Sequence, residues 1–310
     1  MKLPRAPYPV DLHCHTTRSD GADTPLELID RAAARGMRVI AMTDHDLRPA
    51  RSVRAGDGEE ISLIGYAAAH GVKLLPGIEI SCDTDVEDVH IVGLGCNWDD
   101  PFFAQLEQEV ARSKLESYRV LVEALAQAGY PIGWQELLEQ NEKAGKSLQK
   151  KQIFELLAAK GCFGSWSEAK LMTKRDSRFR IRRRKPRPEA VIEALHVAGG
   201  VAILAHPFLI TPLDPQPEDF RGAYIDTLLA AGIDAMEASY PYGKTSYHGS
   251  SSAAELEALV RRLYAPRLRF LSGGSDYHAD FKRGVQNARE IGECGLSYAE
   301  YLAADPLRTL

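Results

Sequence analysis

The chain has 310 residues, of which 45% are hydrophobic and 26% charged, with a formal net charge of −5, a composition typical of a soluble globular protein rather than a disordered one. No apolar run approaches the length of about 18 residues needed to span a membrane, and the N-terminus lacks the apolar core of a signal peptide. The five cysteines form no CxxC pair, so we expect no thiolate zinc site and a cytoplasmic location. We also expect no membrane contact and no obligate protein partner.

Seven short runs of apolar or β-branched residues predict strands. They lie at 8–13, 38–43, 72–80, 88–95, 200–205, 233–239 and 267–274. A capping box, Thr24-Pro25-Leu26-Glu27, predicts a helix that continues to Gly36. Further helices are predicted near 58–70, 188–198, 221–231 and 252–264. Strands that alternate with helices favour parallel βα units, and hence a barrel or a doubly wound sheet.

This alternation stops between residues 98 and 187. Apolar residues recur at helical spacing from Phe102 to Leu125, and helices are predicted near 134–143 and 149–160. We therefore predict a helical insertion, 98–187, in a catalytic barrel formed by 1–97 and 188–310. The insertion ends in a basic segment, residues 174–187, with nine Lys or Arg and one Asp. Such a segment is either solvated or a contact for phosphates or nucleic acid.

Histidines and carboxylates gather at the ends of the predicted strands. Residues two apart in a strand point the same way, so His13 and His15 share a face, as do Asp276 and His278. Functional side chains of parallel barrels collect at the carboxyl ends of the strands. One histidine at a strand end is more often structural, but the repetition predicts a metal centre. Its predicted ligands are His13, His15, Asp20, His45, Glu79, His90, His206, Asp276 and His278.

The ligand types indicate which metals to expect. Imidazole and carboxylate without thiolate suit Mn²⁺, Fe²⁺ or Zn²⁺. Nine ligands exceed what one ion needs, so we expect two or three divalent ions that share a carboxylate such as Glu79. Clustered cations lower the pKa of a bound water and bind a phosphoryl oxygen. The pattern therefore predicts hydrolysis of a phosphate ester.

The order of the motifs resembles one known family. HxH at 13–15, SDG with Asp20, TDHD at 43–46, GIEIS at 77–81, His90, LAHP at 204–207 and SDYH at 275–278 together resemble the PHP (polymerase and histidinol phosphatase) family of metal-dependent phosphoesterases. The resemblance is to its stand-alone 3′,5′-nucleotide bisphosphate phosphatases and 5′-3′ exoribonucleases. It implies an α/β fold, a distorted (β/α)7 barrel with a helical insertion.

The same resemblance implies how the ligands are shared. His13, His15, Glu79 and Asp276 would hold one ion. Asp20, His45 and His278 would hold a second, and Glu79, His90 and His206 a third. The implied reaction is hydrolysis, through a metal-bridging hydroxide, of a nucleotide of the 3′,5′-bisphosphate type or of a 5′-phosphorylated short RNA. The alternatives are a histidinol phosphatase, a cyclic nucleotide phosphodiesterase and a non-catalytic RNA- or nucleotide-binding module.

Two further residues are predicted to serve catalysis. His248, in a long loop after the sixth strand, could protonate the leaving oxygen, although a surface histidine is an equal alternative. Asp44 is expected to orient His45.

Substrate contacts are expected in the insertion. Similar enzymes carry a GRPHIA-like stretch, where this chain has Gln149-Lys150-Lys151-Gln152-Ile153-Phe154, so that Lys150 replaces an arginine and Gln152 a histidine. The cations predicted to bind a non-reacting phosphate are Arg112, Arg119, Lys150, Arg182 and Arg184.

Overall fold

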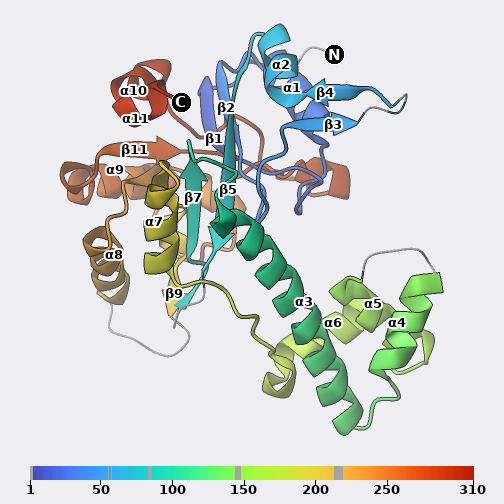
Figure 1. The fold of residues 1–310 in the computed structure, drawn as a ribbon. Helices are drawn as coiled ribbons and strands as arrows, with labels where there is room; N and C mark the ends of the chain where they lie inside the picture. The colour runs from blue at the N-terminus through green and yellow to red at the C-terminus, as the bar shows by residue number, and fades with distance from the viewer. Residues whose placement is uncertain (1–2, 55, 57, 83–85, 144–147, 213–218) are drawn as a thin grey trace. The chain divides into compact units, whose positions relative to one another are not determined.

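A computed structural model describes residues 3–54, 56, 58–82, 86–143, 148–212 and 219–310. The chain divides into two compact units. Unit 1 comprises residues 1–107 and 186–310, and unit 2, which lies within the predicted insertion, comprises residues 108–185. Unit 1 contains the large sheet, whereas unit 2 is helical (Figure 1). Among the described residues, we find no helix whose length and hydropathy would allow it to cross a membrane.

All seven predicted strands are present, and they form one sheet in the order β1-β2-β5-β7-β8-β10-β11. Their bounds are Val10–Cys14, Val39–Met42, Lys73–Ser81, His90–Leu94, Val201–Leu204, Ala235–Ser239 and Phe270–Gly273. Beyond β11, the backbone N–H of Tyr277 donates to the carbonyl of His13 at 3.3 Å, and the carbonyl of Tyr277 accepts from the N–H of His15 at 2.8 Å. These bonds join the two edges, so the predicted distorted (β/α)7 barrel is confirmed.

One strand runs against the others. β7 pairs antiparallel with β5 and with β8, whereas the other neighbouring strands pair in parallel. Only eight residues, 82–89, join β5 to β7, and antiparallel strands need no helical crossover. The expectation of parallel βα units is therefore wrong for this strand. As a consequence, His90 at the beginning of β7 lies at the same edge of the barrel as the carboxyl ends of its neighbours.

Helices connect the remaining strands of unit 1. They are α1 Pro25–Ala34, α2 Leu63–Ala69, α7 Pro188–Val197, α8 Phe220–Ala230 and α9 Ala253–Leu263. The predicted capping box is present on α1, where the Thr24 hydroxyl accepts from the N–H of Glu27 at 3.3 Å and Oε2 of Glu27 accepts from the N–H of Thr24 at 2.7 Å. The helix predicted near 58–70 is shorter, because residues 60–62 pair with residues 52–54 as a hairpin.

Short elements complete unit 1. The hairpin consists of β3 Ser52–Arg54 and β4 Glu60–Ser62, and a second small sheet pairs β6 Val86–Glu87 with β9 Thr211–Pro212. Four 3-10 turns lie at η2 Pro207–Leu209, η3 Tyr242–Lys244, η4 Ala265–Arg267 and η5 Asp280–Arg283. The chain ends in α10 Tyr298–Ala303 and α11 Asp305–Arg308.

Unit 2 has its own apolar core. The long helix α3, Pro101–Gln127, begins in unit 1 and continues into unit 2. The predicted helices appear as α4 Trp134–Lys143 and α5 Lys150–Ala159. Helix α6 Trp166–Arg175 and the turn η1 Ser177–Phe179 were not predicted. The buried side chains of the core include Leu121, Leu125, Ile153, Leu157 and Phe179.

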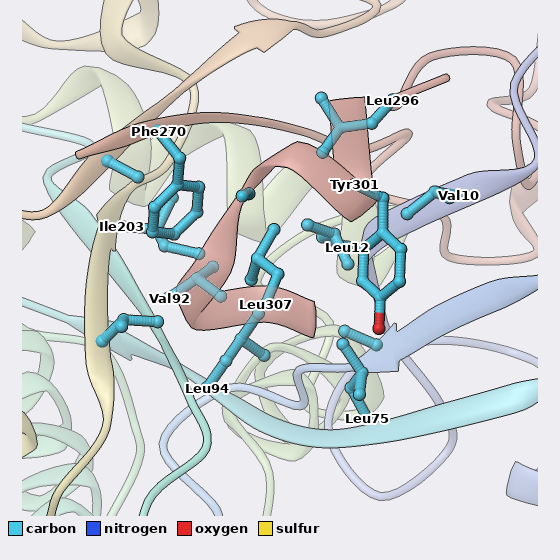
Figure 2. Packing of buried hydrophobic residues seen from close by; sticks show 14 of the residues in the cluster. Val10, Leu12, Leu75, Val92, Leu94, Ile203, Phe270, Leu296, Tyr301 and Leu307 are labelled. Atoms are coloured by element: carbon cyan, nitrogen blue, oxygen red, sulfur yellow. The ribbon is translucent and has the colours of Figure 1, made fainter. Parts of the chain in front are cut away.

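The interior of the barrel is layered. Every strand of the seven-stranded sheet contributes to one buried apolar cluster, which residues of α10 and α11 complete (Figure 2). Leu75 of β5 and Val92 of β7 belong to this cluster. On the same strands, Glu79 and His90 lie four and two residues away and therefore point to the same side of the sheet. The strands thus place polar side chains directly beyond an apolar core.

Candidate metal centre

The nine predicted ligands converge at one edge of the barrel. Their nitrogen and oxygen atoms form three sets in which all atoms lie within 4.8 Å of one another. The sets are His13, His15, Glu79 and Asp276; His15, Asp20, His45 and His278; and His45, Glu79 and His90. His206 adjoins the third set, with its Nε2 at 3.1 Å from Oε1 of Glu79. The structure therefore brings all nine side chains together.

A bulge in β1 aims the first two histidines. The pairing of β1 with β2 changes register between Asp11 and Cys14. Leu12 belongs to the core inside the barrel, yet Cys14, two residues later, packs in the cluster that contains residues of α1 and α2. Bulges of this kind re-aim side chains next to active sites. Because of the bulge, His13 and His15 point into the centre although Leu12, directly before them, also points into the barrel.

Glu79 is the hub of the centre. It is 1% exposed, and both of its oxygens face imidazoles. Oε2 lies 3.1 to 3.2 Å from a ring nitrogen of His13, His15 and His45. Oε1 lies 2.9 Å from Nδ1 of His90 and 3.1 Å from Nε2 of His206. Burial would raise the pKa of this carboxyl group, but the neighbouring histidines hold it well below its usual range.

In two of the histidines, a hydrogen bond from Nδ1 determines that Nε2 is the nitrogen that faces the centre. Nδ1 of His13 lies 2.9 Å from Oε1 of Glu237, and Nδ1 of His278 lies 2.8 Å from the backbone oxygen of Asp276. A carboxylate or a carbonyl oxygen accepts only, so each Nδ1 carries the proton. The Nε2 atoms are left for the centre, where Nε2 of His13 lies 3.1 Å from Nε2 of His15.

The two oxygens of Asp276 face different partners. Oδ1 lies 3.2 Å from Nε2 of His15 and 3.5 Å from Nε2 of His13. Oδ2 accepts hydrogen bonds from the hydroxyl of Tyr240, at 2.7 Å, and from Nη1 of Arg289. Asp276 also has φ +49°, which L-residues rarely adopt. Backbone and side-chain contacts together aim one oxygen at the histidine pair.

Asp44 holds the loop of Asp20 rather than His45. Its Oδ1 accepts from the N–H of Thr16 at 2.8 Å and from the hydroxyl of Ser19 at 2.7 Å. Its Oδ2 accepts from the hydroxyl of Thr16 at 2.8 Å. The prediction that Asp44 orients His45 is therefore wrong, because both carboxylate oxygens are bound to the loop that precedes Asp20.

The donor set fits divalent cations. Among the described residues, Nδ1 of His15, His45 and His206 is buried and has no hydrogen-bond partner. Nδ1 of His45 lies 3.1 Å from Glu79 without a hydrogen bond between them. Burial and the charges of His15 and His90 lower the pKa of His45 to about 3, whereas acidic neighbours overcome burial and raise that of His15 to about 9. Buried imidazole nitrogens without a hydrogen-bond partner, grouped around a shared carboxylate, are a donor set suited to divalent cations.

A cavity of about 260 Å³ opens beside the centre. Its wall includes predicted ligands such as Glu79 and His206, together with Tyr240, Lys244 and Arg289. Lys244 is engaged by Glu293 and donates to the carbonyl of Ala288 at 3.0 Å. Among the described residues, His248 is not part of this wall and is exposed. The geometry thus gives no support to His248 as the proton donor.

The cations predicted to bind phosphate all lie in unit 2. Arg119 pairs with Glu116 and Glu123 on its own helix, at 2.6 Å each. Lys150 is the first residue of α5, and burial together with the charge of Arg183 lowers its pKa. The other three, all exposed, are Arg112, Arg182 and Arg184. Their role in binding substrate stays a prediction.

Sequence reasoning assigned no role to Glu237 and Arg289. Glu237 is 1% exposed and lies on the otherwise uncharged strand β10. A lone carboxylate within a buried strand is a signal that could have identified it. Arg289 follows η5 in a segment without regular structure, and nothing in its local sequence indicates that it reaches the centre.

The PHP domain family matches residues 11–183, and the chain belongs to this family. A phosphoribosyl 1,2-cyclic phosphate 1,2-diphosphodiesterase of Eggerthella lenta is 29% identical over 282 residues, 88% of this chain and 95% of the relative. The 5′-3′ exoribonuclease Rnm of Escherichia coli is 31% identical over 294 residues, 86% of this chain and 84% of its own. A 3′,5′-nucleoside bisphosphate phosphatase of Chromobacterium violaceum is 38% identical over 120 residues, 39% of each chain.

The fold is also similar to solved structures. A protein of Bifidobacterium adolescentis described as a metal-dependent phosphoesterase superposes with a TM-score of 0.64 at 25% identity. The superposition covers 96% of this chain and 95% of that protein. The predicted resemblance to the PHP family is therefore confirmed by sequence and by fold.

Proposed function

We propose that the chain is a metal-dependent phosphoesterase that hydrolyses a nucleotide 3′,5′-bisphosphate or the 5′ end of a short RNA. The observation that carries the proposal is the convergence of nine nitrogen- and oxygen-bearing ligands beside an open cavity of about 260 Å³. Two or three ions of Mn²⁺, Fe²⁺ or Zn²⁺ held by these ligands would lower the pKa of a water molecule and neutralise charge on the phosphoryl oxygens.

The protein's own residues prepare the site for these ions. Glu79 faces five histidines and belongs to two of the three ligand sets. Glu237 and the backbone of Asp276 hold the protons on Nδ1 of His13 and His278. Because these partners are buried, the ligands are already oriented before an ion binds, which favours tight and specific binding.

Unit 2 supports a substrate with more than one phosphate. It carries seventeen Lys or Arg and nine Asp or Glu, a net charge of +8, whereas the rest of the chain carries −13. A basic unit attracts polyanions and suits histidinol phosphate, a cationic amine, poorly. The relative named as a cyclic phosphate diphosphodiesterase matches over 95% of its own length, so a cyclic phosphate ester is the second candidate.

A substrate panel tests the proposal. Mn²⁺-reconstituted protein is given adenosine 3′,5′-bisphosphate, a 5′-phosphorylated oligoribonucleotide, a cyclic nucleotide and histidinol phosphate, each with and without a chelator. We expect chelator-sensitive turnover of the first or second compound, and the release of mononucleotides distinguishes a nuclease from a phosphatase. A metal-loaded protein that hydrolyses none of the four would contradict the proposal.

The variant Glu79→Ala tests whether turnover depends on the metal centre. It should lose bound metal and turnover together, since Glu79 contacts ligands of all three sets. The matched control is Glu193→Ala, which removes an exposed carboxylate on α7 and should change neither. Retained activity in Glu79→Ala would show that the metal centre is not the catalytic site.

A further inference from the structure

Arg289 is a cation placed inside the metal centre. Its side chain is 16% exposed and forms part of the cavity wall. Nη1 donates to Oδ2 of Asp276, and Nη2 lies 3.2 Å from Oδ2 of Asp280. Nη2 also lies 3.1 Å from Nδ1 of His278, but that nitrogen already carries a proton toward the backbone oxygen of Asp276, so the guanidinium binds the carboxylates alone.

A second donor binds the same oxygen of Asp276. The hydroxyl of Tyr240, which comes from the loop after β10, donates to Oδ2 at 2.7 Å. Tyr240 is 2% exposed. With one buried and one largely buried donor on Oδ2, rotation of the carboxylate is restricted, and Oδ1 is the oxygen that lies beside His13 and His15.

The backbone on the far side of Arg289 is fixed to the barrel. Glu290 accepts from Nε of Arg31 on α1 at 2.8 Å. The N–H of Gly292 donates to Oδ2 of Asp11 on β1 at 2.8 Å, and the carbonyl of Gly292 accepts from the N–H of Tyr8 at 3.0 Å. The segment that carries Arg289 is therefore anchored to the first strand and helix, and a guanidinium held in this way has little freedom to follow a ligand.

These contacts separate two possible roles for Arg289. A residue that binds substrate phosphate is free to turn its N–H groups toward the ligand, whereas the guanidinium of Arg289 is held by two carboxylates, each of which accepts from one terminal nitrogen. A residue that positions a ligand needs firm contacts with that ligand and a fixed backbone, and Arg289 has both. The contacts favour the second role.

We propose that Arg289 is a positioning residue of the metal centre, which acts with Tyr240 to hold Oδ2 of Asp276 and so presents Oδ1 alone beside His13 and His15. The inference rests on the proposed metal-dependent function. The role depends on the shape of the guanidinium and not on its positive charge alone, because a lysine cannot contact Asp276 and Asp280 with two separate nitrogens.

The test compares Arg289→Gln, Arg289→Lys, Tyr240→Phe and the double variant Arg289→Gln/Tyr240→Phe. The control is Arg261→Gln, which removes a partly buried arginine bound to two carboxylates, Glu257 and Glu300, outside the cavity. Each protein is loaded with Co²⁺ and its visible spectrum recorded. The values of kcat and KM are then measured with p-nitrophenyl phosphate, and circular dichroism checks the fold.

We expect both Arg289 variants to lower kcat by about 10- to 100-fold, with KM changed by less than about 3-fold, and to alter the cobalt spectrum. Tyr240→Phe should have a smaller effect of the same kind. Because both donors act on one oxygen, the double variant should lose less than the product of the single losses. Arg261→Gln should match the wild type throughout.

Several results would overturn the inference. Wild-type kcat and spectrum in Arg289→Lys would mean that charge alone suffices, and multiplicative losses in the double variant would mean that the two donors act separately. An unchanged Arg289→Gln in a cobalt-binding protein overturns this inference and leaves the proposed function intact. A wild-type protein that binds no cobalt overturns both.

Discussion

Glu237 accepts a hydrogen bond from Nδ1 of His13 at 2.9 Å, while its second oxygen accepts from the backbone N–H of His206 at 2.7 Å. One buried carboxylate thus connects two of the predicted ligands from behind. Its effect on His13 is to keep the proton on Nδ1 and to leave Nε2 facing Glu79 and His15.

The variant Glu237→Gln should therefore impair metal binding although Glu237 belongs to none of the three ligand sets. An amide can donate as well as accept, so it can hold His13 in the wrong tautomer. We expect metal affinity to fall by about 10- to 100-fold, measured by competition with a chromophoric chelator. Affinity within twofold of the wild type would contradict this role.

Removal of the ions should lower thermal stability. A ligand that binds only the folded state stabilises it, by about 2.7 kcal/mol when its concentration is 100 times Kd. Differential scanning calorimetry with and without a chelator should show a higher Tm for the metal-loaded protein. Glu79→Ala should show the same Tm under both conditions, and an equal effect of chelator on that variant would place the stabilising ions elsewhere.

The end of the chain should matter for stability. Leu307 of α11 is fully buried in the barrel core, whereas Leu302 of α10 is 43% exposed. Leu307→Ala should reduce the free energy of unfolding by about 2–5 kcal/mol, because it leaves a cavity in a packed interior. Leu302→Ala should change it by less than about 0.5 kcal/mol. Urea denaturation of both variants checks this, and equal losses would mean that α11 does not seal the core.

Asp234 provides a pH-dependent contribution. Its Oδ2 accepts from the N–H of Ala202 at 2.9 Å and lies 2.7 Å from Nε2 of His196, while Oδ1 accepts from Arg269 at 2.7 Å. Burial opposes the charged form, but these partners lower the pKa of Asp234 below its usual value of 3.8. The charged form therefore stabilises the fold above that value, and this contribution is lost as the pH falls through the lowered pKa.

Asp234→Asn should accordingly reduce the free energy of unfolding by about 1–3 kcal/mol at pH 7. The difference from the wild type should not decrease between pH 8 and about pH 5 and should shrink below about pH 4. Urea unfolding across this range measures it. A difference that already shrinks between pH 7 and 5 would indicate another titrating group.

The sequence by itself predicted the seven strands and the nine candidate metal ligands that lie together in the structure. The repeated His-x-His and Asp-x-His pattern near the strand ends indicated, from the period of a strand, which side chains would lie together. Because neighbouring strands of a barrel meet at one edge, side chains near their ends could be expected to converge.

Only the tertiary structure decided how these side chains are held. The direction of β7 depends on which strands it pairs with, and it places His90 at the beginning of its strand. Glu237, Tyr240 and Arg289 reach His13 and Asp276 across sequence separations that no local pattern encodes. Asp44 likewise turned out to bind the Asp20 loop. A hydrogen bond is made by atoms that meet in space, and that meeting is fixed by packing between elements distant in the chain.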